Sequence, residues 1–158
     1  MDRFKMTKQY KEADKYVTFL PTGKEYSLIG FQEGYGITET DKKYLDYGFT
    51  IAKNFRNQEY YKFLIDTKKK LELVSNAYSL HYEAIYQDER FGASVSKYPL
   101  ITLFAGTNDY SAKARTNIEG FTNEVGRWVK HVDVSEVEII PVKEPIDLVQ
   151  FLPNNTIK

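Results

Sequence analysis

The sequence alternates along Tyr78-Ser-Leu-His-Tyr-Glu-Ala-Ile-Tyr86, where every second side chain is apolar or aromatic. Successive side chains of a β-strand point to opposite faces of the sheet. The three tyrosines, Leu80 and Ala84 therefore share one face, whereas His81 and Glu83 share the other. This pattern predicts a half-buried strand over residues 78–86, around which the rest of the fold can be placed.

Strand patterns flank this stretch on both sides. Tyr16–Leu20 and Tyr26–Phe31 are rich in aromatic and branched residues, and the Pro-Thr-Gly-Lys turn near their junction predicts a β-hairpin. Leu100–Ala105 is apolar on both faces and predicts a central strand, preceded by a polar connection over residues 88–98. Val134–Ile140 predicts another strand.

Three segments carry apolar residues at helical spacing. They cover residues 40–55, 57–74 and 111–129, and Thr38 or Thr40 is placed to cap the first of them. The third segment repeats apolar residues at i, i+4, i+7 and i+11, which lie on one face of a helix. Each segment is therefore predicted to be an α-helix.

Together these segments predict an α+β fold in the order β-β-α-α-β-β-α-β. A single mixed or antiparallel sheet of about five or six strands would carry helices packed mainly on one face. A chain of 158 residues is expected to form a single domain. Residues 1–15 predict an N-terminal arm, and residues 141–158 predict an extended C-terminal tail in which 146–152 could add an edge strand.

The composition favours a protein that binds other molecules over one that catalyses a reaction. The chain has 13 Tyr, 10 Phe and one Trp, but two His and no Cys, so disulfides, thiolate catalysis and zinc ribbons are excluded. Lys plus Arg and Asp plus Glu each total 22, and this zero net charge makes nucleic acid an unlikely main ligand. The glycines of Gly30-Phe-Gln-Glu-Gly34-Tyr-Gly36 lack the spacing of a phosphate-binding loop, so no cofactor is predicted.

The two histidines are the first candidates for chemistry. His81 and Glu83 are two residues apart on the predicted strand and so share a face, as a two-point metal or acid–base site would require. An ordinary polar strand face explains the same pattern more simply. His131 follows Lys130 at the end of the third predicted helix, where a protonated imidazole would favour the helix dipole. Neither histidine is predicted to be catalytic or to bind a metal.

Paired carboxylates are the remaining candidates. A hydrolase built on two carboxylates needs them to converge in one cleft, and solvated surface charge is the simpler interpretation. The sequence therefore predicts no catalytic residues. The pairs in question are Asp88 with Glu89, Glu136 with Glu138, and Asp41 with Asp46.

The number of tyrosines predicts a protein that works through contacts with other proteins. Tyrosine is enriched at interfaces because it combines a large apolar ring with a polar tip. The predicted interface residues are Tyr44, Tyr47, Tyr60 and Tyr61, on the first two predicted helices. The predicted function is a non-enzymatic assembly protein, a homo-oligomer or part of a larger structure, such as a subunit of a viral, phage-like particle.

Two alternatives remain open. One is a small phage-type accessory protein that binds and inhibits a host protein, and the lesser one is a small hydrolase with a carboxylate site. Met1–Lys5 leads into a polar segment rather than a signal peptide, and the apolar run Pro99–Ala105 is too short to span a bilayer. The chain is therefore expected in the host cytoplasm or in the virion, without a membrane.

Overall fold

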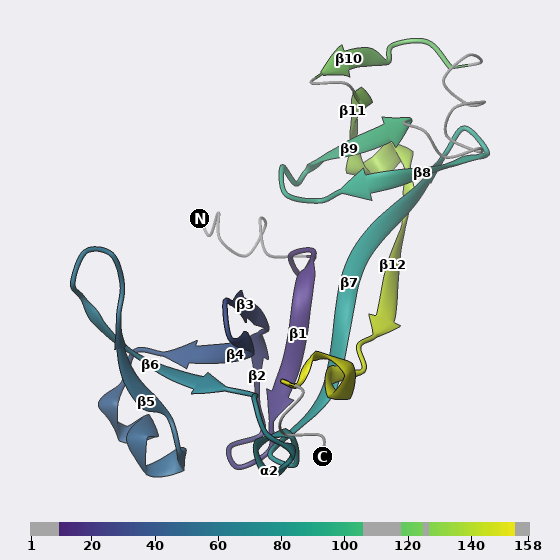
Figure 1. Ribbon diagram of the computed structural model, residues 1–158. Coiled ribbons are helices and arrows are strands. Elements are labelled where there is room, and N and C mark those ends of the chain that lie inside the picture. Colours follow the sequence, from purple (N-terminus) through teal and green to yellow (C-terminus); the bar gives the residue numbers. More distant parts are fainter. Residues whose placement is uncertain (1–9, 106–117, 125–126, 154–158) are drawn as a thin grey trace. The chain divides into compact units, whose positions relative to one another are not determined.

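The computed structural model describes residues 10–105, 118–124 and 127–153, and these residues are mostly β-structure (Figure 1). Eight strand pairs among the described residues are antiparallel. The strands are β1 (Asp14–Phe19), β2 (Lys24–Ser27), β3 (Ile29–Phe31), β4 (Gly34–Glu39), β5 (Thr50–Lys53), β6 (Glu59–Leu64), β7 (Val74–Tyr86), β8 (Glu89–Ser94), β9 (Leu100–Ala105), β10 (Thr122–Glu124), β11 (Arg127–Asp133) and β12 (Glu138–Pro145).

The helical segments among the described residues are short. They are the 3₁₀ segments η1 (Lys42–Tyr47), η2 (Val134–Glu136) and η3 (Leu148–Phe151), and the single α-helical turn α2 (Lys68–Leu71). The predicted α+β fold, with helices packed on one sheet, is therefore wrong.

Residue contacts divide the chain into two compact units. Unit 1 comprises Met1–Ala13 and Leu80–Lys143, and unit 2 comprises Asp14–Ser79 and Glu144–Lys158. Strands β7 and β12 contribute residues to both units, and β12 pairs with β7. The expectation of a single domain stays a prediction.

Unit 1 is built on strands in the order β10-β11-β9-β8-β7. The second half of β7 confirms the alternation of the sequence, because Leu80, Tyr82, Ala84 and Tyr86 are all buried. Strand β9 lies between β8 and β11, as predicted for a central strand. The side chains on one face of this sheet form the core of the unit: those of β7 just named, with Phe91, Ile101, Leu103, Ala105 and Val132.

The predicted polar connection over residues 88–98 is wrong in its first half, which forms β8. Tyr86 pairs with Glu89, so a loop of two residues joins β7 to β8. Gln87 and Asp88 both have positive φ, 51° and 65°, as a tight hairpin turn of matching twist requires. Neither residue is glycine or asparagine, so the sequence carries no strong signal for this turn.

The third predicted helix is also wrong where the structure describes it. Thr122–Glu124 and Arg127–Asp133 form the antiparallel strands β10 and β11, and β11 pairs with β9 along six residues. Residues 111–117 lie outside the described residues. The segment Val134–Ile140, predicted as a strand, begins with η2 and joins β12 only from Glu138.

Unit 2 holds the sheet β3-β4-β6-β5, together with the β1–β2 hairpin and the first half of β7, which follows β1 in the larger sheet. The hairpin confirms the prediction from Tyr16–Leu20 and Tyr26–Phe31, although the second segment divides into β2 and β3. Its turn contains Gly23 at φ +72°, a conformation that glycine adopts without strain. The core of the unit is aromatic and centres on Phe19 and Phe63.

The first two predicted helices are wrong. Gly48 ends η1 in the left-handed conformation, at φ +95°, and the chain then enters β5. Residues 59–65 follow the two-residue period of a strand, since Tyr61, Phe63 and Ile65 are buried. The same residues also fit a helical stripe, so the spacing of apolar residues alone did not distinguish the two structures.

The tail predicted over 141–158 is not extended throughout. Strand β12 ends at Pro145, and η3 follows with Asp147 as its N-cap, whose side chain accepts a hydrogen bond from the Val149 N–H. Leu148 and Leu152 are buried, so this segment packs within unit 2 rather than forming an edge strand. Residues 1–9 of the predicted arm and 154–158 of the tail lie outside the described residues.

Candidate functional site

The hairpin of β5 and β6 in unit 2 exposes an aromatic ring at its tip. Phe55 lies in the loop between the two strands, and 93% of its surface is accessible to solvent. The loop is held by its own hydrogen bonds, because the Asn54 side-chain oxygen accepts from the backbone N–H groups of Arg56 and Gln58 at 2.9 and 3.0 Å. The guanidinium of Arg56 lies 5.5 Å from the Phe55 ring centre. The ring is therefore presented by an ordered turn.

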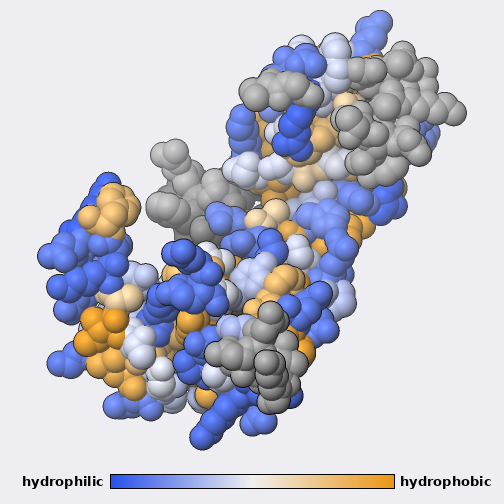
Figure 2. All heavy atoms as spheres, in the orientation of Figure 1, coloured by the Kyte–Doolittle hydropathy of each residue, from blue (hydrophilic) through white to orange (hydrophobic). Residues whose placement is uncertain are grey.

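Strand β5 extends this surface along the edge of the sheet. Its neighbour is β6 on one side, and the order β3-β4-β6-β5 places it at the end of the sheet (Figure 1). Ile51 in this strand is 56% exposed. Figure 2 shows hydrophobic atoms, in orange, at the surface of the part of unit 2 that holds this hairpin. An edge strand with exposed apolar side chains can pair with a further strand.

The four tyrosines predicted at an interface divide into two kinds. Tyr44 and Tyr61 are buried in the core of unit 2, with 9% and 8% of their surface exposed. Tyr47 is 41% exposed and Tyr60 is half-buried, so both keep side-chain surface for a partner. The interface role of the four stays a prediction. Phe55 was missed because it is the last apolar residue of the segment 40–55, whose helical spacing predicted an α-helix.

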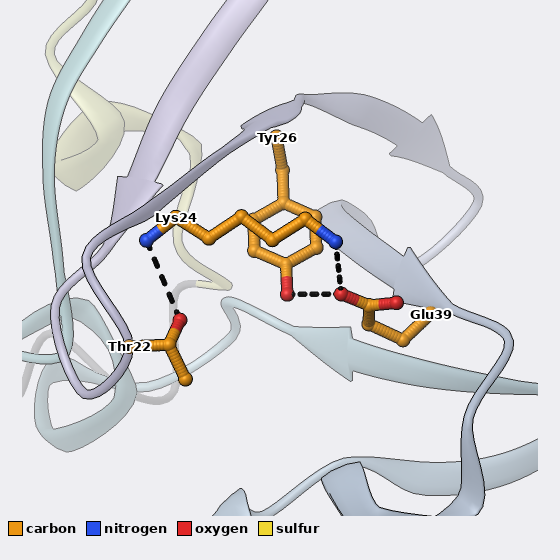
Figure 3. Close-up of polar contacts among 4 residues, drawn as sticks. All are labelled: Thr22, Lys24, Tyr26 and Glu39. Carbon is orange, nitrogen blue, oxygen red and sulfur yellow. Dashed lines mark hydrogen bonds and ion pairs between the residues drawn. The ribbon is translucent and has the colours of Figure 1, made fainter.

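A second cluster in unit 2 joins β2 to β4 through charged hydrogen bonds (Figure 3). One carboxylate oxygen of Glu39 accepts hydrogen bonds from the Tyr26 hydroxyl at 2.5 Å and from the Lys24 ammonium at 2.7 Å. The Glu39 side chain is 9% exposed and that of Lys24 is 51% exposed. The Lys24 nitrogen also lies 4.9 Å from the centre of the Tyr26 ring, a cation–π contact.

These contacts change the ionisation of all three groups. Burial favours the neutral form of Glu39, but the hydrogen bonds from Lys24 and Tyr26 outweigh it and hold the pKa of Glu39 below its ordinary value. The hydrogen bond to Glu39 raises the pKa of Lys24. Burial raises the pKa of Tyr26, and Glu39 raises it further. The tyrosine thus stays protonated, which suits a hydrogen-bond donor that holds the fold rather than an acid–base catalyst.

Replacing Glu39 by glutamine is expected to lower the free energy of unfolding by about 1 kcal/mol at neutral pH, because two charge-assisted hydrogen bonds weaken. A carboxyl whose pKa is lowered by folding stabilises the fold above its unfolded pKa, and this stabilisation disappears as the pH falls through the folded pKa. Urea unfolding at several pH values should therefore show the two proteins converging below about pH 4. If the free energies of unfolding of the two proteins differed by the same amount down to pH 2.5 or so, the lowered pKa of Glu39 would be contradicted.

In unit 1, His131 lies within strand β11 and not at a helix end, so its predicted role as a helix cap is wrong. The register pairs it with Thr102 of β9, and its Nδ1 lies 3.0 Å from the Thr102 hydroxyl oxygen. Its Nε2 lies 3.6 Å from a carboxylate oxygen of Glu124 in β10. These residues belong to the lining of a depression of about 280 Å³ on the sheet.

The geometry predicted for His81 is confirmed, since Glu83 lies on the same face with a carboxylate oxygen 4.0 Å from the His81 Nε2. Glu83 is also held by Arg90 of β8, whose Nε donates a hydrogen bond to it at 2.6 Å. A metal ion would have to displace this arginine. Within residues 10–105, 118–124 and 127–153, no three histidine or carboxylate side chains are grouped as a metal site.

The paired carboxylates sit at the ends of turns and short helices. Asp41 caps η1 by accepting a hydrogen bond from the Lys43 N–H, and Glu136 accepts from the Asp133 N–H in a capping box. Asp88 lies in the β7–β8 turn. Local hydrogen bonding therefore accounts for Asp41 and for Glu136, each of which belongs to a different pair.

No protein-family model, curated protein or solved structure matches the chain. None of the helices among the described residues is both long and apolar enough to cross a membrane.

Proposed function

We propose that this chain is a non-enzymatic protein that acts through protein–protein contacts and that its principal contact element is the β5–β6 hairpin of unit 2. The observation that carries the proposal is Phe55, a ring 93% exposed on a hydrogen-bonded loop. Burying such a side chain against a partner contributes about 1.5–3 kcal/mol. Because the loop is already ordered, little conformational freedom remains to be lost on binding.

The edge strand β5 supports the same proposal. Its outer side can accept a strand from a partner, with main-chain hydrogen bonds giving affinity and exposed side chains such as Ile51 giving specificity. The exposed side chain of Tyr47, from η1 just before β5, would add contact area. The backbone thus offers a row of hydrogen-bonding groups, and the tip offers an apolar anchor.

A second copy of the chain is the first partner that we propose. Two copies can pair their β5 strands about a two-fold axis, and a net charge of zero gives little mutual repulsion. The setting suggested by the sequence, a subunit of a virus-like particle, extends this self-association to a larger assembly. The alternative partner is a different protein, bound by the same hairpin, as for an accessory protein that acts on a host.

The mass of the native particle tests this proposal. Light scattering of the purified chain over a range of concentrations should give a multiple of the single-chain mass. Phe55→Ser should weaken association by about tenfold or more, because a central aromatic anchor is lost. Leu100→Ser is the matched control, since Leu100 is 45% exposed but lies in unit 1.

A chain that stays monomeric at 100 μM or so would exclude stable self-association of the kind that assemblies need. If such a monomer bound a different protein in a Phe55-dependent manner, the alternative would hold. Equal effects of the Phe55 and Leu100 substitutions would show that the hairpin has no special role.

A further inference from the structure

The antiparallel register of unit 1 gathers polar side chains on the sheet face opposite its core. Ser94 of β8 pairs with Thr102 of β9, and Thr102 pairs with His131 of β11. Paired residues of neighbouring strands point to the same face, so these three side chains form one row across the sheet. Phe104, two residues after Thr102 in β9, points to the same face and pairs with Gly92 of β8. Because glycine has no side chain, this part of the face is not covered from β8.

The row is fixed by hydrogen bonds. Thr102 is 7% exposed and is the buried polar residue of the described core, and its hydroxyl bonds to the His131 Nδ1. Glu124 lies 3.6 Å from the other ring nitrogen of His131 and orients the ring from the far side. The hydroxyls of Ser94 and Ser96 lie 3.0 Å apart beside the same depression. The floor therefore consists of oriented hydroxyl groups and a ring nitrogen.

Two positive charges, those of Lys97 and Arg127, border this floor, and Glu124 lies opposite Arg127 in the register of β10 and β11. The guanidinium of Arg127 lies 4.0 Å from the centre of the Phe104 ring, a cation–π contact that holds it on this face of the sheet. Among the residues that the structure describes, neither Arg127 nor Lys97 forms an ion pair. The N–H groups of Arg127 therefore remain available as a planar set of donors, the arrangement that suits carboxylate and phosphate groups.

We propose that this depression binds a small oxyanion, a phosphate group or a phosphate monoester. Arg127 and Lys97 supply the charge, and the hydroxyls of Ser94, Ser96 and Thr102 supply further hydrogen bonds to the oxygens, while His131 holds the Thr102 hydroxyl in place. A volume of about 280 Å³ accommodates a phosphate with a small organic group. Glu124, which pairs with Arg127 in the register and lies 3.6 Å from the His131 Nε2, offsets one of the two positive charges.

Other ligands fit less well. A divalent cation prefers several carboxylate oxygens, and Glu124 is the single carboxylate among the described lining residues. A nucleic acid strand would need an extended basic groove with several stacking rings, whereas the described lining has no Tyr or Trp and one Phe, Phe104, whose ring already contacts Arg127. This proposal is independent of the one for the β5–β6 hairpin, which lies in unit 2.

Titration of the isotope-labelled full chain with inorganic phosphate, followed by NMR, tests the proposal. Saturable shifts are expected for the amides of Thr102 and Arg127 and for the His131 ring. A titration with chloride at matched ionic strength should leave these signals unchanged. A phosphate monoester such as glycerol phosphate should bind at least as tightly as phosphate, and acetate more weakly, because it offers fewer oxygens and less charge.

Substitutions assign the site. Arg127→Gln should weaken phosphate binding about tenfold, and Thr102→Val should weaken it by about threefold through loss of one hydroxyl. Arg90→Gln is the matched control, since Arg90 lies on the same sheet face but is already paired with Glu83. The amide spectrum of each variant shows whether it is folded.

Three results would overturn the proposal. The first is the absence of a saturable response to phosphate in the folded wild-type chain. The second is an equal loss of binding in the Arg90 and Arg127 variants, which would indicate a diffuse effect of charge. The third is a short single-stranded oligonucleotide that binds at the same residues far more tightly than either phosphate compound.

Discussion

Replacing Phe19 by alanine is expected to lower the free energy of unfolding by about 3–5 kcal/mol, the range typical of removing a fully buried aromatic ring. Phe19 has no exposed surface, and its ring contacts four others edge-on: those of Tyr26, Tyr47, Phe49 and Phe63, with centres 5.1–6.4 Å away. The neighbouring rings are rigid and cannot collapse into the space, so both the buried area and the ring–ring contacts are lost.

Phe55→Ala is the matched control for this substitution. It removes the same ring from a position that is 93% exposed, so the free energy of unfolding should change by less than about 0.5 kcal/mol. Urea unfolding followed by circular dichroism measures both changes. Similar losses for the two variants would show that the aromatic core of unit 2 is not packed as described.

The same Phe19 variant tests whether the two units unfold as one domain. Trp128 is the single tryptophan of the chain and lies in unit 1, whereas Phe19 lies in unit 2. Strand β7 is continuous through both units, so we expect the tryptophan fluorescence transition of the variant to shift together with circular dichroism. A fluorescence transition that stays at the wild-type urea concentration would instead indicate two domains.

The strands that the sequence predicted correctly share one property. Residues 78–86 alternate strictly, and the first hairpin has a glycine in its turn, so the two-residue period and the turn point to the same structure. Strand β9 is a short apolar run that lies centrally in its sheet. In each case local pattern and tertiary environment agree.

The predicted helices failed because apolar spacing is ambiguous in short segments. Residues 59–65 fit both the helical period and the two-residue period of a strand. The contacts of Phe63 with Phe19 and Phe49 favour the strand. In this strand Tyr61, Phe63 and Ile65 face the core. The stretch Val125-Gly-Arg-Trp-Val129 has a similar ambiguity, and pairing with β9 and β10 makes its last three residues part of a strand. Such partners are distant in sequence and cannot be read from local spacing.

The candidate sites could not be predicted from local sequence patterns for the same reason. The sequence identified Tyr as the residue type in surplus, but Tyr44 and Tyr61 complete an aromatic core, and Phe55 is the most exposed ring among the described residues. His131 gains Thr102 and Glu124 as neighbours only through the pairing of β9, β10 and β11. Thr102 and His131 are 29 residues apart in the sequence, so the site that they form leaves no local motif.

Replacing Gly36 by alanine is expected to destabilise the sheet of unit 2 by about 3 kcal/mol, near the upper end of the usual cost of overpacking. A Cβ atom at this position in β4 would lie 2.8 Å from the backbone oxygen of Phe63 in β6 and 3.0 Å from the Phe31 ring in β3. The oxygen belongs to the backbone of a paired strand and cannot move without shifting β6. Since β6 carries the exposed hairpin, association should weaken together with stability.

Gly30→Ala separates this steric effect from the general difference between glycine and alanine. Gly30 lies in the adjacent strand β3, and its added Cβ would find its nearest neighbour, a Tyr35 ring carbon, at an ordinary 3.8 Å. Its free energy of unfolding should therefore change by less than about 0.5 kcal/mol. Thermal unfolding of both variants decides between the two explanations. If both lost the same stability, a general requirement for glycine in these strands would replace the close approach of β4 and β6 as the cause.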